Sequence, residues 1–418
     1  MASIVDRTLD CGLRVLIERV EGVRSASLVW LTPAGAASDP TDRLGQSALW
    51  GELVLRGAGR FDSRAQADAL DRVGANRATS TSSRFLSISL GVVGARLGEA
   101  LPLVVDMVLR PRFDESSIGP AKDLAIQAIE ALRDDPGERA GVALRARHFA
   151  SPFNRSTLGS EEGITLATRE DLVEGWRARA RPRGSIVGIA GAVDPEQVVR
   201  ELERLLVGWE GRAPEPLPEG VPARGYAHEI DQTNQVQIVL AHDAPAEGHP
   251  DAWNERAVAA VLSGGMSSRL FSEVREKRGL CYSVGARYST DRDFGVLTAD
   301  VGTQPDRAQQ SLDVLWSELE RVHSPEGRVT REEFDRAIVG MKSRLVFSGE
   351  STGARAGAIA SDAFKLGRAR SLEELAASVD GLTLEGVGEY LARRRIGRAT
   401  LQTLGPGALV EPRTLAGE

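Results

Sequence analysis

The order of strands and helices in this chain repeats after about 200 residues, and this repeat constrains the fold more than any other feature. Late in the first half, residues 168–172 (TREDL) open a helix that leads to an apolar strand at 185–190. Late in the second half, residues 383–387 (TLEGV) open a helix that leads to a strand at 399–403. Because the sequence has 418 residues, too many for one ordinary core, the repeat predicts two similar domains.

The other segments of the two halves also correspond, as judged from apolar residues at a period of two or of three to four. The first half has strands at 13–17, 25–31 and 79–92 and helices at 45–56, 63–73, 97–109 and 118–132. The second half has strands at 235–241, 282–288 and 296–301 and helices at 253–262, 268–277, 312–322 and 334–345. The pattern predicts an α+β fold of two homologous domains, each a mainly antiparallel sheet with helices packed on one face.

A short segment rich in proline, glycine and glutamate separates the two halves. Residues 214–222 read PEPLPEGVP, a composition typical of a linker. We therefore predict an N-terminal domain at 1–212, a linker at 213–224 and a C-terminal domain at 225–418.

Composition excludes several classes of partner. A net charge of −7 gives no general attraction for nucleic acid or for an anionic membrane. The basic runs 176–184 and 392–398 each follow an amphipathic helix, so we interpret them as cationic helix ends. Two cysteines fit a reducing compartment. With neither a signal-peptide pattern nor 18 consecutive apolar residues, the sequence predicts a cytoplasmic protein without a membrane partner.

No common catalytic or metal-binding motif is present. The sequence contains neither G-x-S-x-G nor a phosphate-binding loop ending in Lys-Ser/Thr. None of the five histidines is four residues from another, and we interpret His242 and His249 as ordinary loop histidines. Cys281 has no local partner for nucleophilic chemistry and is predicted to be a small buried residue.

One segment, 262–284 (LSGGMSSRLFSEVREKRGLCYSV), does bring two strong hydrogen-bond donors close together. Leu270, Phe271 and Val274 predict the buried face of a helix that ends at Gly279. Tyr282 then begins a strand and is expected on the same side as residues 284, 286 and 288. Arg275 and Tyr282 can both donate to a carbonyl or an oxyanion, although the pattern alone favours purely structural roles, a structural arginine and a core tyrosine.

This segment closely resembles the C-terminal half of the pitrilysin/insulinase-type metallopeptidases, which also include the mitochondrial processing peptidase and the respiratory-complex core proteins. Further similarities run in the same order along nearly the whole chain. They lie at 45–57 (GQSALWGELVLRG), 61–79, 110–113, 151–168 and 191–195. The resemblance implies two homologous α+β domains, in agreement with the repeat.

The resemblance also implies that the zinc site of the first half is lost. Active members carry H-x-x-E-H, and the corresponding positions here are Ala48, Gly51 and Glu52. The third zinc ligand of the family corresponds to Ala128, with Glu130 close by. Without imidazole ligands or a general base, the chain alone is expected to bind no zinc and to cleave no peptide.

The second half keeps what the first half lost. The R-x6-Y pair of the family, which faces the zinc ion and polarises the scissile carbonyl, corresponds to Arg275 and Tyr282. Some bacterial relatives divide the zinc motif and this pair between two chains. The resemblance therefore implies a heterodimer in which this chain supplies Arg275 and Tyr282, while a homologous subunit with an intact H-x-x-E-H supplies zinc and the general base.

Two alternatives remain open from the sequence. The chain could be a non-catalytic scaffold or peptide-binding protein of the core-protein type, in which the pair is an inherited fold element, and an isolated chain could form a homodimer. It could also be a peptidase with a different metal site, which the missing ligands disfavour.

Overall fold

The computed structural model describes residues 4–413, which form two compact units. Unit 1 contains the residues up to Ala131, together with Ala150–Gly220 and Ser348–Ser371. Unit 2 contains Leu132–Phe149, Val221–Phe347 and the residues from Leu372 onward. The change of unit between Gly220 and Val221 falls within the predicted linker, but two shorter segments are exchanged between the halves of the sequence. The exchange of Leu132–Phe149 and Ser348–Ser371 was not predicted from the sequence.

Unit 1 is built on a six-stranded sheet with the order β1-β2-β8-β3-β7-β6. The pair β2–β8 is parallel and the other neighbours are antiparallel, so the sheet is mixed. Its strands are β1 (Ile4–Thr8), β2 (Arg14–Arg19), β3 (Ser25–Thr32), β6 (Asn76–Thr81), β7 (Leu86–Val93) and β8 (Ile186–Gly191), and a separate hairpin joins β4 (Gly57–Ala58) to β5 (Phe61–Asp62). The helices are α1 (Gln46–Leu53), α2 (Ser63–Arg72), α3 (Leu97–Leu109), α4 (Glu115–Ala131), α6 (Glu161–Leu166), α7 (Arg169–Arg179), α8 (Pro195–Leu205) and α12 (Thr352–Leu366).

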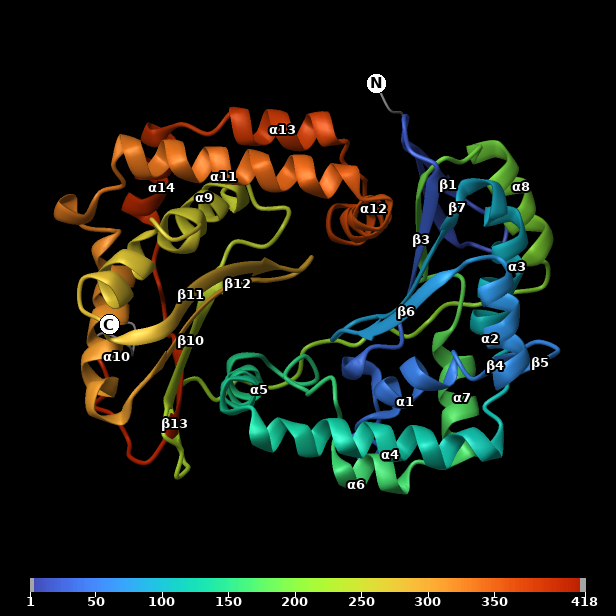
Figure 1. Ribbon diagram of the computed structural model, residues 1–418, viewed down its shortest axis with the longest axis horizontal. Helices are drawn as coiled ribbons and strands as arrows, with labels where there is room; N and C mark the ends of the chain where they lie inside the picture. Colours follow the sequence, from blue (N-terminus) through green and yellow to red (C-terminus); the bar gives the residue numbers. More distant parts are fainter. Residues whose placement is uncertain (1–3, 414–418) are drawn as a thin grey trace. The chain divides into compact units, whose positions relative to one another are not determined.

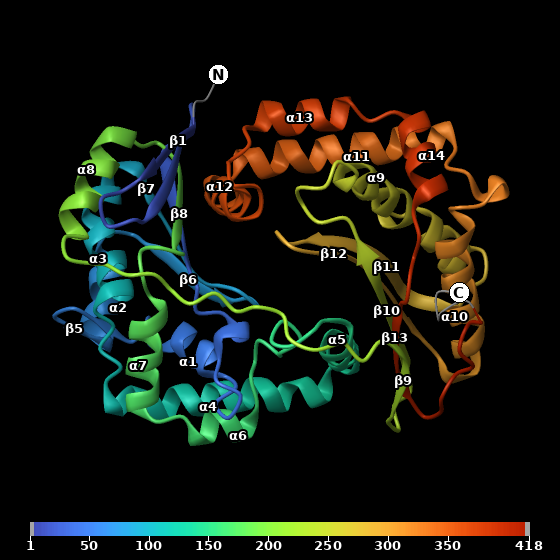
Figure 2. The ribbon, with the colours of Figure 1, turned by 180° about the vertical axis from the view of Figure 1, so that it is seen from behind.

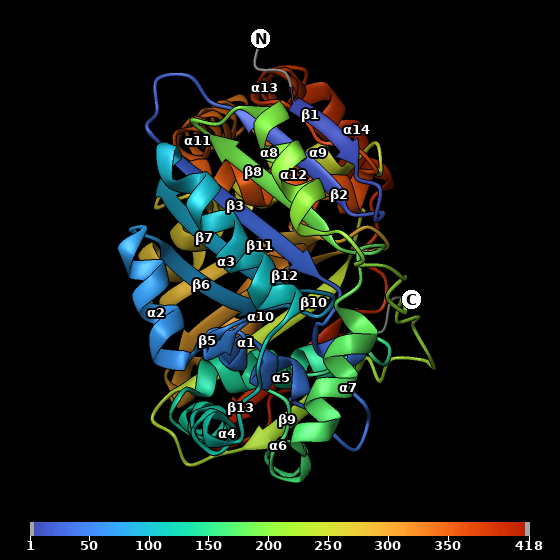
Figure 3. The same ribbon diagram turned by 90° about the vertical axis from the view of Figure 1, so that its right-hand side faces the viewer.

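The two faces of this sheet are covered by different helices. Val15 and Ile17 point into the main core, which is closed by helices such as α3 and α8 (Figure 3). Leu16 points the other way and packs against α12, which the second half of the sequence supplies (Figures 1 and 2). Gly188 permits this contact, because a Cβ atom there would lie 2.1 Å from the Ala356 carbonyl oxygen. The predicted helical layer on one face is therefore joined by one helix on the opposite face.

Unit 2 repeats this plan with a five-stranded mixed sheet of the order β11-β12-β10-β13-β9, in which β13 and β9 are parallel. Helix α5, from the first half of the sequence, packs through Ala140 and Leu144 on the face opposite the main core (Figure 1). The strands are β9 (Gly225–Ile230), β10 (Val236–Ala244), β11 (Cys281–Thr290), β12 (Gly295–Thr303) and β13 (Thr400–Gly405). The helices are α5 (Pro136–His148), α9 (Ala252–Ser263), the π-helix η4 (Phe271–Glu276), α10 (Ala308–Arg321), α11 (Arg331–Glu350), α13 (Leu372–Asp380) and α14 (Leu384–Arg393), and short 3-10 turns lie at Ala36–Ser38, Gly94–Arg96, Leu132–Asp134, Pro305–Arg307 and Pro325–Gly327.

The predicted α+β class is confirmed, and local capping explains why the helix starts were predictable. Thr168 and Asp171 form a reciprocal capping box at the start of α7, and Thr330 and Glu333 do the same before α11. Helices α5 and α12 were not predicted. In the part of the chain that the structure describes, none of the helices has the length and apolar character needed to cross a bilayer.

Candidate functional site

The four positions that the resemblance assigns to a lost zinc site come together in unit 1. Ala48, Gly51 and Glu52 on α1 line a cavity of about 440 Å³ together with Ala128 on α4, so residues about 80 positions apart meet there. Glu130, the alternative third ligand, is exposed and does not line the cavity. The other lining residues are Thr79, Ser80 and Thr81 from β6, Ala121, Leu124 and Ala125 from α4, and Thr157 and Leu158.

The cavity offers little polar chemistry. Glu52 lies 2.6 Å from Arg56, in an ion pair between α1 and the turn that follows it. The hydroxyls of Thr79 and Thr81 donate to the backbone carbonyls of Gly51 and Ser47, at 2.8 and 3.2 Å. These threonine hydroxyls therefore connect strand β6 to helix α1, and their donors are not available to a ligand.

The residues of this cavity do not fit a zinc ion. Its lining contains no histidine, and its one carboxylate is already paired with an arginine. Over residues 4–413, no cluster of three or more His, Cys, Asp or Glu side chains is arranged to hold a metal. No reaction step through a metal bound by this chain can be derived from these side chains.

The predicted helix before Arg275 is present, but its last turns are wider than in an α-helix. Leu270 and Val274 are fully buried, as predicted, whereas Phe271 is half-buried at the edge of the core. The backbone N–H of Lys277 donates to the carbonyl oxygen of Ser272, five residues back, at 2.9 Å. Such π-type turns inside helices are often found at functional sites.

The corner after this helix is fixed by hydrogen bonds. Gly279 has φ of +60°, which confirms its predicted role as the residue that ends the helix. Its carbonyl oxygen accepts a hydrogen bond from Arg307, at 2.5 Å. The next carbonyl oxygen, that of Leu280, accepts from the buried Thr303 hydroxyl, also at 2.5 Å. The entry into β11 is thus held by two neighbouring segments.

Tyr282 does not share a side with residues 284, 286 and 288, and this corrects the sequence analysis. Strand β11 has a bulge at its start: Cys281 pairs with Thr303, Ser283 pairs with Gly302, and Tyr282 is the extra residue between them. The bulge leaves Cys281 half-buried and turns Tyr282 outward, with 81% of the residue exposed. Alternation counted from the sequence could not reveal this insertion.

Arg275 lies between two aromatic rings. Its guanidinium carbon is 4.7 Å from the centre of the Phe271 ring and 5.3 Å from the centre of the Tyr282 ring. Within residues 4–413, neither the Arg275 guanidinium nor the Tyr282 hydroxyl has a hydrogen bond or an ion pair. The structure therefore brings the two predicted residues together as unused donors.

The neighbouring cations behave differently. Lys277 and Arg278 both pair with Glu273, each at 2.7 Å. Cys281 is also unsuited to nucleophilic chemistry, because burial raises the pKa of its thiol and the nearby charge of Arg275 only partly opposes this shift. Arg275 and Tyr282 are the donors that remain available at this corner.

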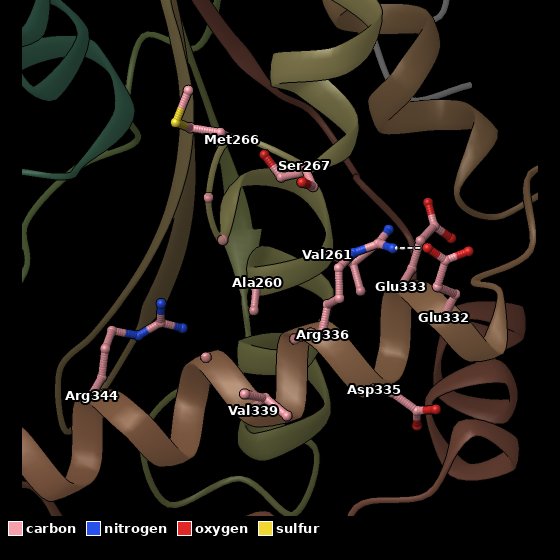
Figure 4. A pocket seen from close by; sticks show the side chains of 15 residues that line it. Ala260, Val261, Met266, Ser267, Glu332, Glu333, Asp335, Arg336, Val339 and Arg344 are labelled. Carbon is pink, nitrogen blue, oxygen red and sulfur yellow. Dashed lines mark hydrogen bonds and ion pairs between the residues drawn. The ribbon is translucent and has the colours of Figure 1, made fainter.

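A larger cavity of about 540 Å³ lies nearby in unit 2, between helix α11 and the loop at 264–268 (Figure 4). Its floor is formed by small apolar residues such as Ala260 and Val261, and Arg336 pairs with Glu332 at its rim. Neither Arg275 nor Tyr282 lines this cavity. Size alone therefore does not identify the site.

The interpretation of His242 as a loop histidine was wrong. His242 lies in β10 and is fully buried, whereas His249 lies in a loop. Arg394 donates to Nε2 of His242 at 3.2 Å and to Nε2 of His323 at 2.8 Å. Because an arginine can only donate, both imidazoles are neutral, and their Nδ1 atoms donate to backbone carbonyls. This network ties β10 to Arg394 and to the residues around positions 323 and 391.

Comparison with known proteins agrees with this architecture. The model of the family described as "Insulinase (Peptidase family M16)" matches residues 14–161, and the model described as "Peptidase M16 inactive domain" matches residues 167–341. A Mycobacterium tuberculosis protein named as an uncharacterized zinc protease is 28% identical over 94% of this chain and 92% of its own length. A Streptomyces coelicolor protein with the same description is 26% identical, over 96% and 89%.

Solved structures share the fold over nearly the whole chain. A peptidase M16 inactive domain from Pseudomonas fluorescens superposes with a TM-score of 0.88 at 21% identity, covering 98% of this chain and 99% of that one. A protease from Helicobacter pylori gives 0.85 at 17% identity, covering 97% and 100%. A chain of complex III2 from Candida albicans gives 0.79 at 17% identity, covering 97% and 96%. At these identities the likeness shows the fold alone.

The duplicated α+β fold, which over residues 167–341 matches the model described as a peptidase M16 inactive domain, is that of a peptidase-like protein. Together the two family models match more than half of the chain, in the order in which its two domains occur. The chain belongs to peptidase family M16.

Proposed function

We propose that this chain is the non-zinc subunit of a heterodimeric zinc metallopeptidase. One observation carries the proposal: Arg275 and Tyr282 lie side by side without hydrogen-bond partners, although Lys277 and Arg278 two or three residues away are both ion-paired. A homologous subunit with an intact H-x-x-E-H would supply the zinc ion and the general base. The names of the relatives, which are called zinc proteases, support this reaction class.

In this role the two side chains act on a peptide carbonyl. The Tyr282 hydroxyl projects from the bulge and can donate to the oxygen on which charge develops. The Arg275 guanidinium presents several N–H donors in a plane and can hold the substrate backbone or the same oxygen. Donors that need not break an existing hydrogen bond are already organised for the transition state.

The test is a peptide-cleavage assay on the complex reconstituted with a homologous zinc-binding chain. We expect Tyr282→Phe to lower kcat by about 10²–10³, because removal of one oxyanion donor has this effect in other enzymes. Tyr288→Phe is the matched control: it removes a hydroxyl from the same strand that donates to the Pro245 carbonyl, and kcat should stay unchanged. Full activity of Tyr282→Phe would refute the catalytic role.

The same assay separates the scaffold alternative. If the chain is only a scaffold or a peptide-binding protein, substitution of Tyr282 or Arg275 should leave the cleavage rate of the reconstituted complex unchanged. A zinc measurement on the purified chain addresses the remaining alternative, a peptidase with its own metal site, because stoichiometric zinc in the wild-type chain would contradict the present proposal.

A further inference from the structure

We propose that Phe271 is a positioning residue, which together with the Tyr282 ring clamps the Arg275 guanidinium in the orientation needed to meet a substrate oxygen. This inference rests on the proposed function of Arg275 and Tyr282. It assigns a role to a residue that the sequence pattern placed in the buried face of the helix.

The position of the Arg275 guanidinium between two aromatic rings supports this role. The guanidinium carbon of Arg275 lies 4.7 Å from the Phe271 ring centre and 5.3 Å from the Tyr282 ring centre, within the range in which a cation is attracted to an aromatic face. Stacking on rings leaves the N–H donors at the guanidinium edge free. An ion pair with a carboxylate, such as the one Glu273 makes with Arg278, would occupy those donors.

The rings of Phe271 and Tyr282 are both held in place by the surrounding backbone and core. The Phe271 ring is half-buried beside Leu270 and Val274, which are fully buried, so it rests on a rigid support. The wide turn from Phe271 to Glu276 changes the direction in which Arg275 leaves the helix, and the bulge at Tyr282 turns the second ring outward. Two irregular backbone features therefore converge on one side chain.

Arg275 is only partly buried, and its guanidinium has no ion-pair partner among residues 4–413. A long side chain without ion-pair partners samples many rotamers, and ordering it opposes binding by an amount comparable to one good contact. Rings that hold the guanidinium before substrate arrives remove part of that entropy loss. The clamp should therefore act on kcat and on substrate affinity through Arg275 alone.

The experiment compares Phe271→Leu with Phe271→Tyr in the full chain, using NMR of the arginine side-chain Nε–H groups. Aromatic rings shift the resonances of nuclei above their faces, so the Arg275 signal reports the clamp directly. We expect the ring-induced shift to be lost largely in Phe271→Leu, retained in Phe271→Tyr, and lost to a smaller extent in Tyr282→Leu, since that ring is farther away.

The matched control is Phe61→Leu, which removes the ring from an Arg60–Phe61 pair at 4.8 Å in unit 1. It should leave the Arg275 signal unchanged. In the reconstituted peptidase, Phe271→Leu should lower kcat/KM by about 2–5-fold, the size expected for the loss of one cation–π contact. The Phe271→Tyr variant keeps an aromatic ring and should have the kcat/KM of the wild type. Leucine keeps most of the apolar volume, and thermal unfolding checks that the variant is folded.

The outcomes separate the two proposals. An unchanged Arg275 resonance in folded Phe271→Leu would overturn the clamp, whatever the activity. Full activity of Phe271→Leu in a complex that Tyr282→Phe inactivates would also overturn it. Loss of the resonance shift in a complex that Tyr282→Phe leaves active would support the clamp as a structural fact and refute the proposed catalytic function.

Discussion

The two units share one fold, but their corresponding regions hold different chemistry. In unit 1 the cavity at Ala48, Gly51 and Ala128 keeps its walls and lacks metal ligands. In unit 2 the corner at Arg275 and Tyr282 keeps two donors that the rest of the described chain leaves unpaired. The difference shows that two units with one fold can present very different polar groups, because the local backbone and side chains decide which donors are left unpaired.

Introducing zinc ligands into the cavity of unit 1 should have the largest effect. We expect Ala48→His, Gly51→Glu, Glu52→His and Ala128→Glu together to convert a chain without bound zinc into one that binds about one zinc ion, because positions 48 and 52 lie one turn apart on α1 and face residue 128. Metal analysis after dialysis measures this.

The matched control for this prediction keeps Ala128 and changes only the other three positions. Glu130 does not line the cavity, so this variant should bind zinc more weakly than the fourfold variant. Equal binding by the two variants would show that Ala128 is not the third ligand position.

A second prediction compares the exchanged helices. Arg355 on α12 forms a buried pair with Glu18, at 2.6 Å, with side-chain exposures of 2% and 3%. Arg355→Met leaves Glu18 buried without its partner and should destabilise unit 1 by about 3–5 kcal/mol. On α5 of unit 2, Arg139 pairs with Glu229 and Asp231 nearer the surface, so Arg139→Met should change stability by only about 0–1 kcal/mol. Urea unfolding followed by limited proteolysis distinguishes the units, and similar losses in both variants would contradict the comparison.

A third prediction concerns pH. Buried groups in the two units should change the free energy of unfolding with opposite sign as pH falls. Burial, together with the Arg394 charge, lowers the pKa of His242 from 6.5 to about 4. The unfolded chain therefore binds more protons between these values, and this contribution to stability is lost as pH falls from 6.5 towards 4. The loss should be roughly 2–4 kcal/mol for unit 2.

In unit 1, burial raises the pKa of Asp39 from 3.8 to about 6. Its folded state binds more protons than its unfolded state, so this contribution is present below pH 3.8 and is lost as pH rises through 6. Denaturation curves from pH 4 to 8 for wild type, His242→Gln and Asp39→Asn measure both slopes. Identical pH dependence in all three chains would show that neither group is linked to folding.

The smallest expected effect concerns Glu52. Its ion pair with Arg56 joins α1 to the turn that follows it and is partly exposed, so Glu52→Gln should reduce stability by only about 0.3–0.5 kcal/mol and leave metal content unchanged. A clear loss of bound metal would show that Glu52 is a ligand after all.

Some features were predictable because they depend on a few neighbouring residues. The capping residues Thr168 and Thr330 and the helix end at Gly279 can each be read within one short segment. Tyr282 was assigned to the wrong side of its strand, because a bulge of one residue is decided by pairing with β12 and not by alternation. His242 was misjudged because the predicted strand ended at residue 241, whereas β10 continues to Ala244 and the charged and polar groups around His242 come from positions 255, 323 and 394.

By itself the sequence determined the duplication and the positions of many helices and strands, since periodicity and residue identity are local properties. Only the tertiary structure decided that α5 and α12 are exchanged between the units, that Ala128 and not Glu130 completes the cavity, and that Arg275 lies between two rings. The helix exchange and the cavity depend on packing between groups far apart in the sequence, whereas the two rings are near Arg275 in sequence and meet it only because of the wide turn and the bulge. Such contacts leave no periodic trace in the sequence, because the apolar and backbone groups that make them are available to many partners.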